Sequence, residues 1–407
     1  MAERAVIVGG GHAAGQCAAS LRQKGWTGDI VIVGEEPYAP YQRPPLSKAY
    51  LAGDLDAERL YVKPTAFYEK ENVELRLGVR AEAIDRAARD VALSDGERLG
   101  YDVLVLATGA AVRRLPVPGA DLSGVGYVRT IADVDRLRGA FEKARNLVVV
   151  GAGYIGLEVA AVARKRGLEV DVVERADRVM ARVAGPTVSA FFEKLHRDNG
   201  VRLRLGAGFE RFEGDGAGRV REARIAGVGA IPCDVAVVGV GIVPNDRIAA
   251  DAGLAVDDGV LVDDCARTED PRIYAIGDAT RHPSRYFGGR LRLESVHNAI
   301  EQAKTAAAAI CGAPKPYDQA PWFWSDQYDV KLQTVGVCAG REEREIVRGA
   351  PEDKSFSVFY LKDERLLAVD SVNAPADHML SRRLIAAGAP INAAALADPS
   401  VDLKSLA

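Results

Sequence analysis

The 407-residue sequence is poor in cysteine, and this scarcity excludes several kinds of protein. Its five cysteines, which are too few and too widely spaced for a disulfide scaffold, are Cys17, Cys233, Cys265, Cys311 and Cys338. No C-x-x-C pair occurs, so the redox motif of dithiol enzymes is absent. The five histidines also lack the spacing of metal ligands, and we expect no metal site.

Long apolar runs and a dominant charge are missing as well. No apolar stretch approaches the roughly 20 residues that a membrane helix requires, and the first residues lack the features of a secretory signal. We therefore expect a cytoplasmic protein with no membrane partner. The formal net charge of −4 provides no global basic field, so nucleic acid is not expected as a partner.

One sequence pattern occurs twice. Each copy has a β-branched strand, a glycine-rich turn, an Ala-rich helix, a second strand and an acidic residue, which is the order of a dinucleotide-binding βαβ unit. In the first copy the strand Ala5–Val8 precedes Gly9, Gly11, His12, Ala13 and Ala14, and Glu35 follows the second strand. In the second copy the strand Leu147–Val150 precedes Gly151, Gly153, Tyr154, Ile155 and Gly156, and Glu174 follows the second strand.

The chemistry of this pattern is specific. The first glycine forms the turn, the second lets the backbone approach a pyrophosphate, and the third position must be small, which Ala14 satisfies. The pyrophosphate lies on the N–H groups at the positive end of the helix, and the acid accepts hydrogen bonds from ribose hydroxyls. Two such units predict two dinucleotides side by side, as hydride transfer from a nicotinamide to a flavin requires. Two ordinary βα turns remain the alternative.

The rest of the chain indicates three domains. Two prolines and a glycine in Arg113–Gly119 suit a domain crossing, and Gly239–Asn245 suits a second. After about Pro316 the pattern changes to short strands such as Phe356–Leu361, with a helix near 377–387. We predict an α/β protein with a discontinuous first dinucleotide-binding domain (1–113 and 246–320), a second (114–245) and an α+β C-terminal domain (321–407). Glu213–Gly218 is expected to be a hairpin turn.

Several further segments resemble one known family. They are Tyr41–Lys48, Val105–Gly109, Ile276–Asp278, Glu294–Asn298 and Pro321–Tyr328. With the two glycine motifs they make the whole chain resemble the flavoprotein reductases of the putidaredoxin reductase and rhodocoxin reductase type. These enzymes serve [2Fe–2S] ferredoxins in bacterial cytochrome monooxygenase and ring-hydroxylating dioxygenase systems. The resemblance implies a glutathione-reductase-like fold, FAD and NADH as cofactors, and a [2Fe–2S] ferredoxin as partner.

The resemblance also assigns roles to residues. It places Glu35 at the adenosine ribose of FAD, Ala81 near the adenine, Asp278 at the ribitol chain, and the Val296 backbone N–H at the pyrimidine edge of the flavin. It also implies that Lys48 lies beside the flavin and Glu158 near the nicotinamide. These two residues are a possible ion pair, and they are the catalytic candidates. Further cofactor-binding positions implied are Arg43, Ala107, Thr108, Gly109, Arg129, Gly239, Gly277, Glu294, Ser295 and Trp324.

Local patterns add to these roles and leave some open. Ser47 is predicted to cap a helix, which would place Lys48 in its first turn. Glu174 favours NADH because it would repel a 2′-phosphate, although the adjacent Arg175 would attract one. Trp322 and Trp324 are either flavin neighbours or core aromatics, and Cys17 is expected to be a small core residue.

Two other functions stay open on the sequence alone. One is an NADH oxidase or peroxidase, against which the lack of a cysteine at the flavin-facing position of Lys48 counts. The other is an NADH-sensing flavoprotein that acts as a signalling module. A ferredoxin of this class is acidic, so we expect it to dock on a local basic patch formed by Arg285, Arg290, Arg292, Lys304 and Lys331.

Overall fold

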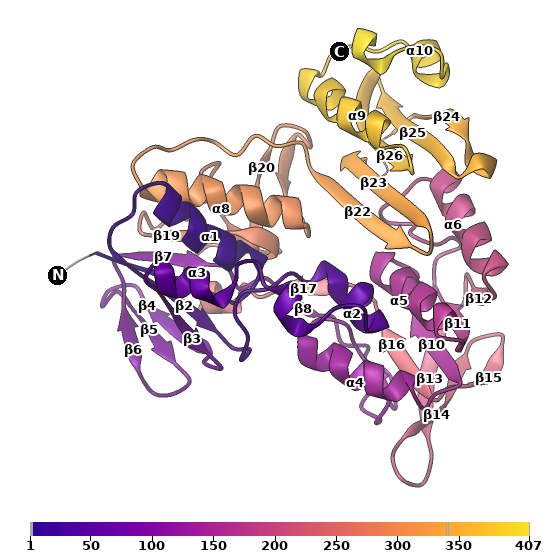
Figure 1. Ribbon diagram of the computed structural model, residues 1–407, viewed down its shortest axis with the longest axis horizontal. Coiled ribbons are helices and arrows are strands. Elements are labelled where there is room, and N and C mark those ends of the chain that lie inside the picture. The colour runs from indigo at the N-terminus through magenta and orange to yellow at the C-terminus, as the bar shows by residue number, and fades with distance from the viewer. Residues whose placement is uncertain (1–2, 339, 341, 407) are drawn as a thin grey trace. The chain divides into compact units, whose positions relative to one another are not determined.

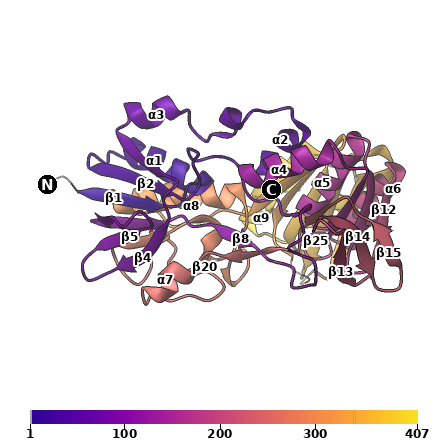
Figure 2. The ribbon, with the colours of Figure 1, turned by 90° about the horizontal axis from the view of Figure 1, so that it is seen from below.

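The computed structural model describes residues 3–338, 340 and 342–406, and the chain forms two compact units (Figures 1 and 2). The first unit comprises the described residues up to Arg43 together with Ala57–Ala111 and Ile242–Pro321. The second comprises Pro44–Asp56, Val112–Gly241 and the described residues from Trp322 onward. No helix of the described chain is long and apolar enough to cross a membrane.

A parallel sheet forms the centre of the first unit. Its strand order is β19-β7-β1-β2-β3, with bounds Ile273–Ala275, Val103–Leu106, Arg4–Val8, Asp29–Gly34 and Val73–Leu77. Ala5 and Ile7 of β1 pack in one core with residues of helices α1 (His12–Gln23) and α8 (Val296–Ile310). Val6 and Val8 point to the opposite core, as the alternation of a strand requires. Because both faces are covered, these strands are apolar throughout rather than alternating with polar residues.

An antiparallel sheet supplies the other cover of the first unit (Figure 1). Its strands are β4 (Ala81–Asp85), β5 (Asp90–Leu93) and β6 (Arg98–Gly100), and Ile84, Val91 and Leu93 pack against the central sheet. Smaller elements of the first unit are η2 (Ala57–Leu60), α3 (Thr65–Lys70), β17 (Ile242–Pro244), α7 (Arg247–Asp251), β18 (Val260–Leu261), η3 (Gly277–Ala279), β20 (Thr280–Ser284) and β21 (Gly289–Leu291). Strand β8 spans Ala110–Val112 at the boundary.

The second unit repeats this plan. Its parallel sheet has the order β12-β11-β10-β16-β9, with bounds Val201–Arg204, Glu169–Val173, Asn146–Val150, Val235–Val238 and Val125–Gly126. Its helices are α4 (Ile131–Phe141), α5 (Tyr154–Lys165) and α6 (Pro186–Asp198), and its antiparallel sheet joins β13 (Phe209–Gly214), β14 (Val220–Ile225) and β15 (Gly229–Pro232). The predicted turn lies between β13 and β14, so that hairpin is confirmed.

A five-stranded antiparallel sheet completes the second unit. The strand order is β22-β23-β26-β25-β24, with bounds Trp322–Gln327, Val330–Gly336, Arg365–Val372, Ser355–Lys362 and Arg344–Ala350. Helix α9 (Pro375–Ala387) confirms the predicted helix, but the chain does not end there, because α10 (Ala393–Ala397) and η5 (Leu403–Leu406) follow; η4 spans Pro351–Asp353. Polar contacts tie this sheet to α6, among them Thr187 Oγ1 to Glu345 Oε2 at 2.7 Å.

The segment Pro44–Asp56 leaves the first unit and lies in the second. It contains η1 (Pro44–Ser47) and α2 (Ala49–Ala52), whose Tyr50 donates a hydrogen bond to Asp135 of α4 at 2.8 Å. The sequence did not indicate this excursion. The three-domain division, with its separate NAD and C-terminal domains, stays a prediction.

Candidate functional site

The first glycine loop fits a pyrophosphate. Gly9 has a φ of +128°, and a Cβ built on it would lie 2.1 Å from the carbonyl oxygen of Ala107. Gly11 is the N-cap of α1, and a Cβ there would meet nothing within 4 Å. The turn therefore requires glycine at the first position and is open at the second, where a ligand would approach the N–H groups of the helix.

The second loop has the same geometry in the other unit. Gly151 has a φ of +104°, and its added Cβ would lie 2.4 Å from the carbonyl oxygen of Gly239. Gly153 caps α5 and is open in the same way as Gly11. An added Cβ on Gly156 would lie 2.1 Å from the Gly151 carbonyl oxygen, so this position needs glycine. The corresponding residue of the first unit is Ala14, which is fully buried. Each unit thus carries one glycine loop with the geometry that a dinucleotide cradle requires.

The predicted adenosine end of the first cradle lies at the end of β2. Glu35 follows that strand with an exposed side chain, 3.8 Å from Arg80. Ala81 opens β4 two residues after Val79, whose N–H donates to the Gly34 carbonyl at 3.0 Å. On the other side of the loop, Thr108 Oγ1 donates to the Asn245 carbonyl and the Asn245 side chain donates back to the Thr108 carbonyl. Gly109 accepts from the N–H of Asn245, a residue that sequence reasoning named only as the end of a crossing.

Gly277 and Asp278 follow β19 and lie against the start of α1. A Cβ on Gly277 would lie 3.3 Å from the Ala13 side chain, which places this turn beside the first glycine loop. The Gly277 N–H donates to Gln302 Oε1 at 2.7 Å, so α8 holds the turn through a buried residue that the sequence did not single out. This arrangement leaves Asp278 at the carboxyl end of the parallel sheet, where ligands of such folds bind.

The implied flavin-edge residues Glu294, Ser295 and Val296 lie at the start of α8. Val296 is its first residue and Ser295 is its N-cap, accepting a hydrogen bond from the Asn298 N–H at 3.0 Å. Glu294 is exposed and pairs with Arg292 at 2.6 Å.

His12, at the start of α1, is largely buried, and burial lowers its pKa to about 4. Arg43 pairs with Glu36 at 2.9 Å, so this arginine already has an anionic partner in the first unit.

The second unit joins Lys48 to Glu158. Lys48 Nζ lies 2.8 Å from Glu158 Oε2, which confirms the expected pairing. The Ser47 prediction was wrong in one respect: Ser47 ends η1 rather than capping a helix, and Lys48 itself is the N-cap of α2. The reason is that Ser47 still belongs to η1, and its hydroxyl is turned toward Glu158 Oε2, to which it donates at 2.5 Å.

Glu174 follows β11 beside the second glycine loop. Its Oε2 accepts from the Ala152 N–H at 2.8 Å and its Oε1 from the Ala176 N–H at 2.9 Å, so the carboxylate is held at the strand end. Arg175 is exposed next to it. Tyr154 and Ile155 form the first turn of α5, where Ile155 is exposed.

Arg129 and Trp324 also belong to the second unit. Arg129 directly precedes Thr130, the N-cap of α4. Trp324 lies on β22 with its ring centroid 5.5 Å from that of Trp322. Both tryptophans are half-buried, and their place at a flavin face stays a prediction.

The thiols are unsuited to redox chemistry. No disulfide joins the five cysteines, and Cys17 and Cys233 are fully buried. Burial raises the pKa of Cys17 to about 12 and that of Cys233 to about 12, and it also raises the pKa of Cys265 and Cys311. Because the thiolate is the reactive form, these groups are inert at neutral pH.

Replacing all five cysteines with Ala or Ser is therefore expected to leave the reduction of bound flavin by NADH intact. Anaerobic stopped-flow absorbance measures the rate, and circular dichroism checks that the variant is folded. A folded Cys17→Ala variant that no longer reduces its flavin would show that a thiol takes part.

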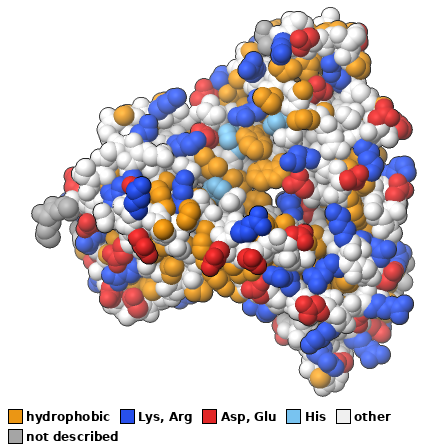
Figure 3. Space-filling view, viewed as in Figure 1, with side chains coloured by type: hydrophobic (Ala, Val, Ile, Leu, Met, Phe, Trp, Pro, Cys, Tyr) orange, Lys and Arg blue, Asp and Glu red, His pale blue; other side chains and the backbone are white. Residues whose placement is uncertain are grey.

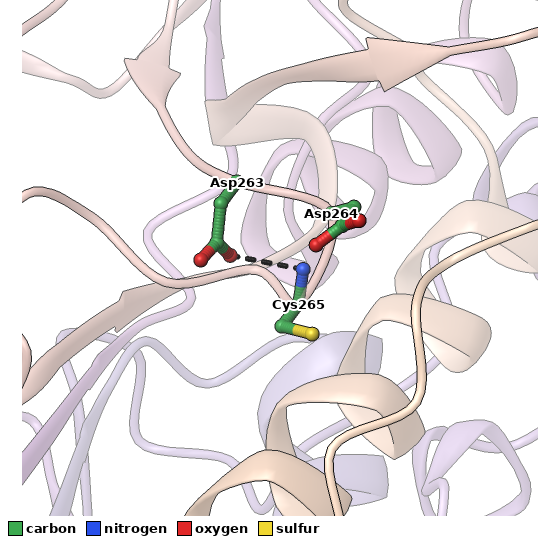
Figure 4. A group of neighbouring side chains, drawn as sticks. All are labelled: Asp263, Asp264 and Cys265. Atoms are coloured by element: carbon green, nitrogen blue, oxygen red, sulfur yellow. Dashed lines mark hydrogen bonds between the residues drawn. The ribbon is translucent and has the colours of Figure 1, made fainter.

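One acidic cluster follows β18 in the first unit. Asp263, Asp264 and Cys265 offer ligand atoms within 4.8 Å of one another (Figure 4). Asp263 Oδ1 already accepts from the N–H groups of Cys265 and Arg267, both at 2.9 Å. These hydrogen bonds form a tight turn, which explains why the three side chains lie close together.

Two glycine loops of this geometry, one in each unit, and a Lys–Glu pair with a buried carboxylate are features of a flavoprotein oxidoreductase that uses a pyridine nucleotide. The family model of pyridine nucleotide-disulphide oxidoreductases matches residues 3–303, and that of the reductase C-terminal domain matches residues 322–407. The ferredoxin reductase subunit of 5,5′-dehydrodivanillate O-demethylase from a Sphingobium strain is 44% identical over 98% of this chain and 97% of its own. Rhodocoxin reductase from Rhodococcus erythropolis is 45% identical over 98% of this chain and 93% of its own.

Solved structures agree. Putidaredoxin reductase in its covalent complex with putidaredoxin has a TM-score of 0.95 and 42% identity, covering 99% of this chain and 98% of that one. The chain therefore belongs to the pyridine nucleotide-disulphide oxidoreductase family, in its ferredoxin reductase branch. It is an FAD-dependent oxidoreductase that uses NAD(H), and its fold is the glutathione-reductase-like one predicted above.

Proposed function

We propose that the protein takes a hydride from NADH onto FAD and passes the electrons singly to a [2Fe–2S] ferredoxin, which feeds a cytochrome monooxygenase or a ring-hydroxylating dioxygenase. The observation that carries this proposal is the whole-chain likeness to ferredoxin reductases, including the C-terminal β-rich segment from Trp322 onward. A flavin supplies the needed chemistry, because it accepts two electrons together and releases them one at a time.

The residues of the first unit would hold FAD. The first glycine loop (Gly9, Gly11, His12, Ala13, Ala14) would take the pyrophosphate, Glu35 the ribose, and Asp278 the ribitol chain. The start of α8 at Val296, with its positive helix end, would stabilise negative charge on the ring. In the second unit, the second glycine loop would take the NADH pyrophosphate, and Lys48 and Glu158 would act at the reacting end.

NADH should be preferred over NADPH in kcat/KM. Glu174 is held by two backbone N–H groups, so its carboxylate would meet a 2′-phosphate directly. Glu174→Gln should narrow the preference by removing this repulsion, and should lower kcat/KM for NADH about tenfold or more through loss of a charged hydrogen bond. Arg175→Gln is the matched change on the neighbouring residue and should leave NADH kinetics unaltered. Equal use of both nucleotides by the wild type would contradict the role given to Glu174.

The proposal also includes the docking of an acidic ferredoxin on basic side chains. Basic and acidic side chains are interspersed on the face drawn in Figure 3. Arg285 pairs with Asp318, Arg292 with Asp258 and Glu294, Lys304 with Glu301, and Lys331 with Asp326, while Arg290 donates to backbone carbonyls. The exposed pairs contribute little energy, so the lysine ammonium groups stay available to a partner. Lys304 belongs to the first unit and Lys331 to the second.

Reduction of a ferredoxin should therefore fall steeply with salt, because the Debye length shrinks to about 8 Å at physiological ionic strength. Lys304→Glu with Lys331→Glu should raise KM for the ferredoxin about tenfold, as expected for a loss of steering. Ferricyanide reduction and flavin reduction should not change. Lys194→Glu, on another exposed lysine with an acidic neighbour, is the control.

Two outcomes would count against the proposal. Equal ferredoxin kinetics of the wild type and the double variant across a salt series would show that docking occurs elsewhere. Faster turnover with oxygen than with any ferredoxin would instead favour an NADH oxidase.

A further inference from the structure

Glu158 is a buried acid with an unusually complete set of donors. Its side chain is 3% exposed, yet both oxygens are satisfied: Oε2 by Lys48 Nζ at 2.8 Å and Ser47 Oγ at 2.5 Å, Oε1 by Ser325 Oγ at 2.6 Å. Lys48 is a cation that can only donate, and a serine hydroxyl lies within hydrogen-bond distance of each oxygen, so polar partners surround this carboxylate. An ionised group in an interior is stable only with such partners.

The donor on Oε1 begins a longer chain of hydrogen bonds. Ser325 Oγ accepts from Gln327 Nε2 at 3.1 Å, since the two residues lie on the same face of β22. Gln327 Oε1 lies 2.8 Å from Nε2 of His196 on α6, and the Tyr328 hydroxyl lies 3.5 Å from His196 Nδ1. Ser325, Gln327 and His196 are all fully buried, so no bulk water competes for these bonds.

The donor-to-acceptor direction of this hydrogen-bond chain is fixed by the carboxylate at its end. A carboxylate only accepts, so the single hydroxyl proton of Ser325 must point to Glu158. The Ser325 oxygen then accepts the Gln327 amide, which leaves the Gln327 carbonyl to accept from His196. Burial lowers the pKa of His196 to about 4, so the ring is neutral, and the Gln327 carbonyl as acceptor places its one proton on Nε2. Every donor in the chain therefore points toward Glu158, and bonds aligned in this way strengthen one another.

We infer that Ser325, Gln327 and His196 are positioning residues that hold Glu158 as an oriented carboxylate against Lys48. The inference rests on the proposed role of the Lys48–Glu158 pair in hydride transfer. The hydrogen-bond chain reaches one carboxylate oxygen, and Lys48 binds the other. Losing the hydrogen-bond chain would therefore let the carboxylate rotate, and the ammonium group would follow it. The three residues touch neither cofactor nor substrate in this scheme.

The test uses the FAD-loaded enzyme and two measurements. In Ser325→Ala, flavin reduction by saturating NADH should slow about tenfold to hundredfold, which matches the loss of a hydrogen bond to a charged group, while KM for NADH stays within about twofold. Ser325→Thr keeps the hydroxyl and should recover most of the rate. Ser357→Ala is the matched control, because Ser357 is also fully buried but donates to Asp377, and its oxygen lies 3.1 Å from that of Ser371.

The second measurement is independent of turnover. Nitrogen-15 NMR of the histidine side chains should show His196 as the Nε2–H tautomer in the wild type, without titration between about pH 5.5 and 8. Glu158→Gln, Ser325→Ala and Gln327→Met should each move the His196 signals, because the direction of the chain is no longer fixed. Ser357→Ala should not move them.

The results of these experiments distinguish the inference about Ser325, Gln327 and His196 from the proposed role of the Lys48–Glu158 pair. Wild-type flavin reduction in Ser325→Ala, or an unmoved His196 signal in both Ser325→Ala and Glu158→Gln, would overturn the inference even if Glu158→Gln itself is slow. Wild-type reduction in Glu158→Gln would refute the proposed role of the Lys48–Glu158 pair, and the inference with it. A slow Ser325→Ala with a displaced His196 signal supports both.

Discussion

Gly151→Ala is expected to leave FAD bound and to abolish most NADH-dependent flavin reduction, whereas Gly9→Ala is expected to release the FAD. In each case the new methyl group would lie within 2.4 Å of a carbonyl oxygen, on Gly239 or Ala107, and the residue would keep a strongly positive φ. The loop must then move off the pyrophosphate position. A displacement of about 1 Å at a binding group costs a rate factor of about a hundred, so kcat/KM for NADH should fall by at least that much in Gly151→Ala.

The chain provides matched controls for both changes. Gly25 and Gly167 follow helices α1 and α5 with φ of +89° and +86°, and a Cβ on either meets nothing within 4 Å. Alanine there carries a backbone cost of about 1–2 kcal/mol without the collision. Both controls should keep FAD and NADH activity, as measured by bound-flavin absorbance and stopped flow. Loss of FAD from Gly151→Ala, or retention of full activity in it, would show that the cradles are assigned wrongly.

The two cradles could be predicted because their causes are local. A β-branched strand, a glycine that must take a positive φ, and an Ala-rich helix all lie within about 25 residues, so pattern and propensity agree. The start of α8 also has a local cause, since Ser295 caps it with its own hydroxyl. The sequence thus identified the elements that position each proposed cofactor.

The surroundings of Glu158 could not be predicted, because its partners are distant in the chain. Ser47 is 111 positions away and Ser325 is 167, while His196 and Gln327 are separated by 131. No periodicity links such residues. The Ser47 cap was predicted from local capping rules, and it failed because Ser47 ends η1 with its hydroxyl turned toward a carboxylate from a distant segment. The excursion of Pro44–Asp56 into the second unit has the same origin: its partners, such as Asp135, lie in another segment.

Lys48→Met is expected to slow flavin reduction by about a hundredfold to a thousandfold and to lower the free energy of unfolding by about 3 kcal/mol. Methionine keeps the length of the side chain but removes the charge, so the reacting end of the site loses its ammonium group. The Glu158 carboxylate stays buried with only its two serine donors. Lys165→Met, an exposed lysine on α5 that donates to a backbone carbonyl, is the control and should change neither quantity measurably.

A double variant separates the chemical role of this pair from its structural one. Glu158→Gln added to Lys48→Met removes the uncompensated charge, so most of the lost stability should return, because a buried pair costs more to break than to delete. The rate of flavin reduction should not return, since the ammonium group is still missing. Urea unfolding and anaerobic stopped flow on the four proteins of this cycle measure both. Recovery of the rate together with the stability would mean that Lys48 serves only to neutralise Glu158, and that the hydride reaches the flavin without its help.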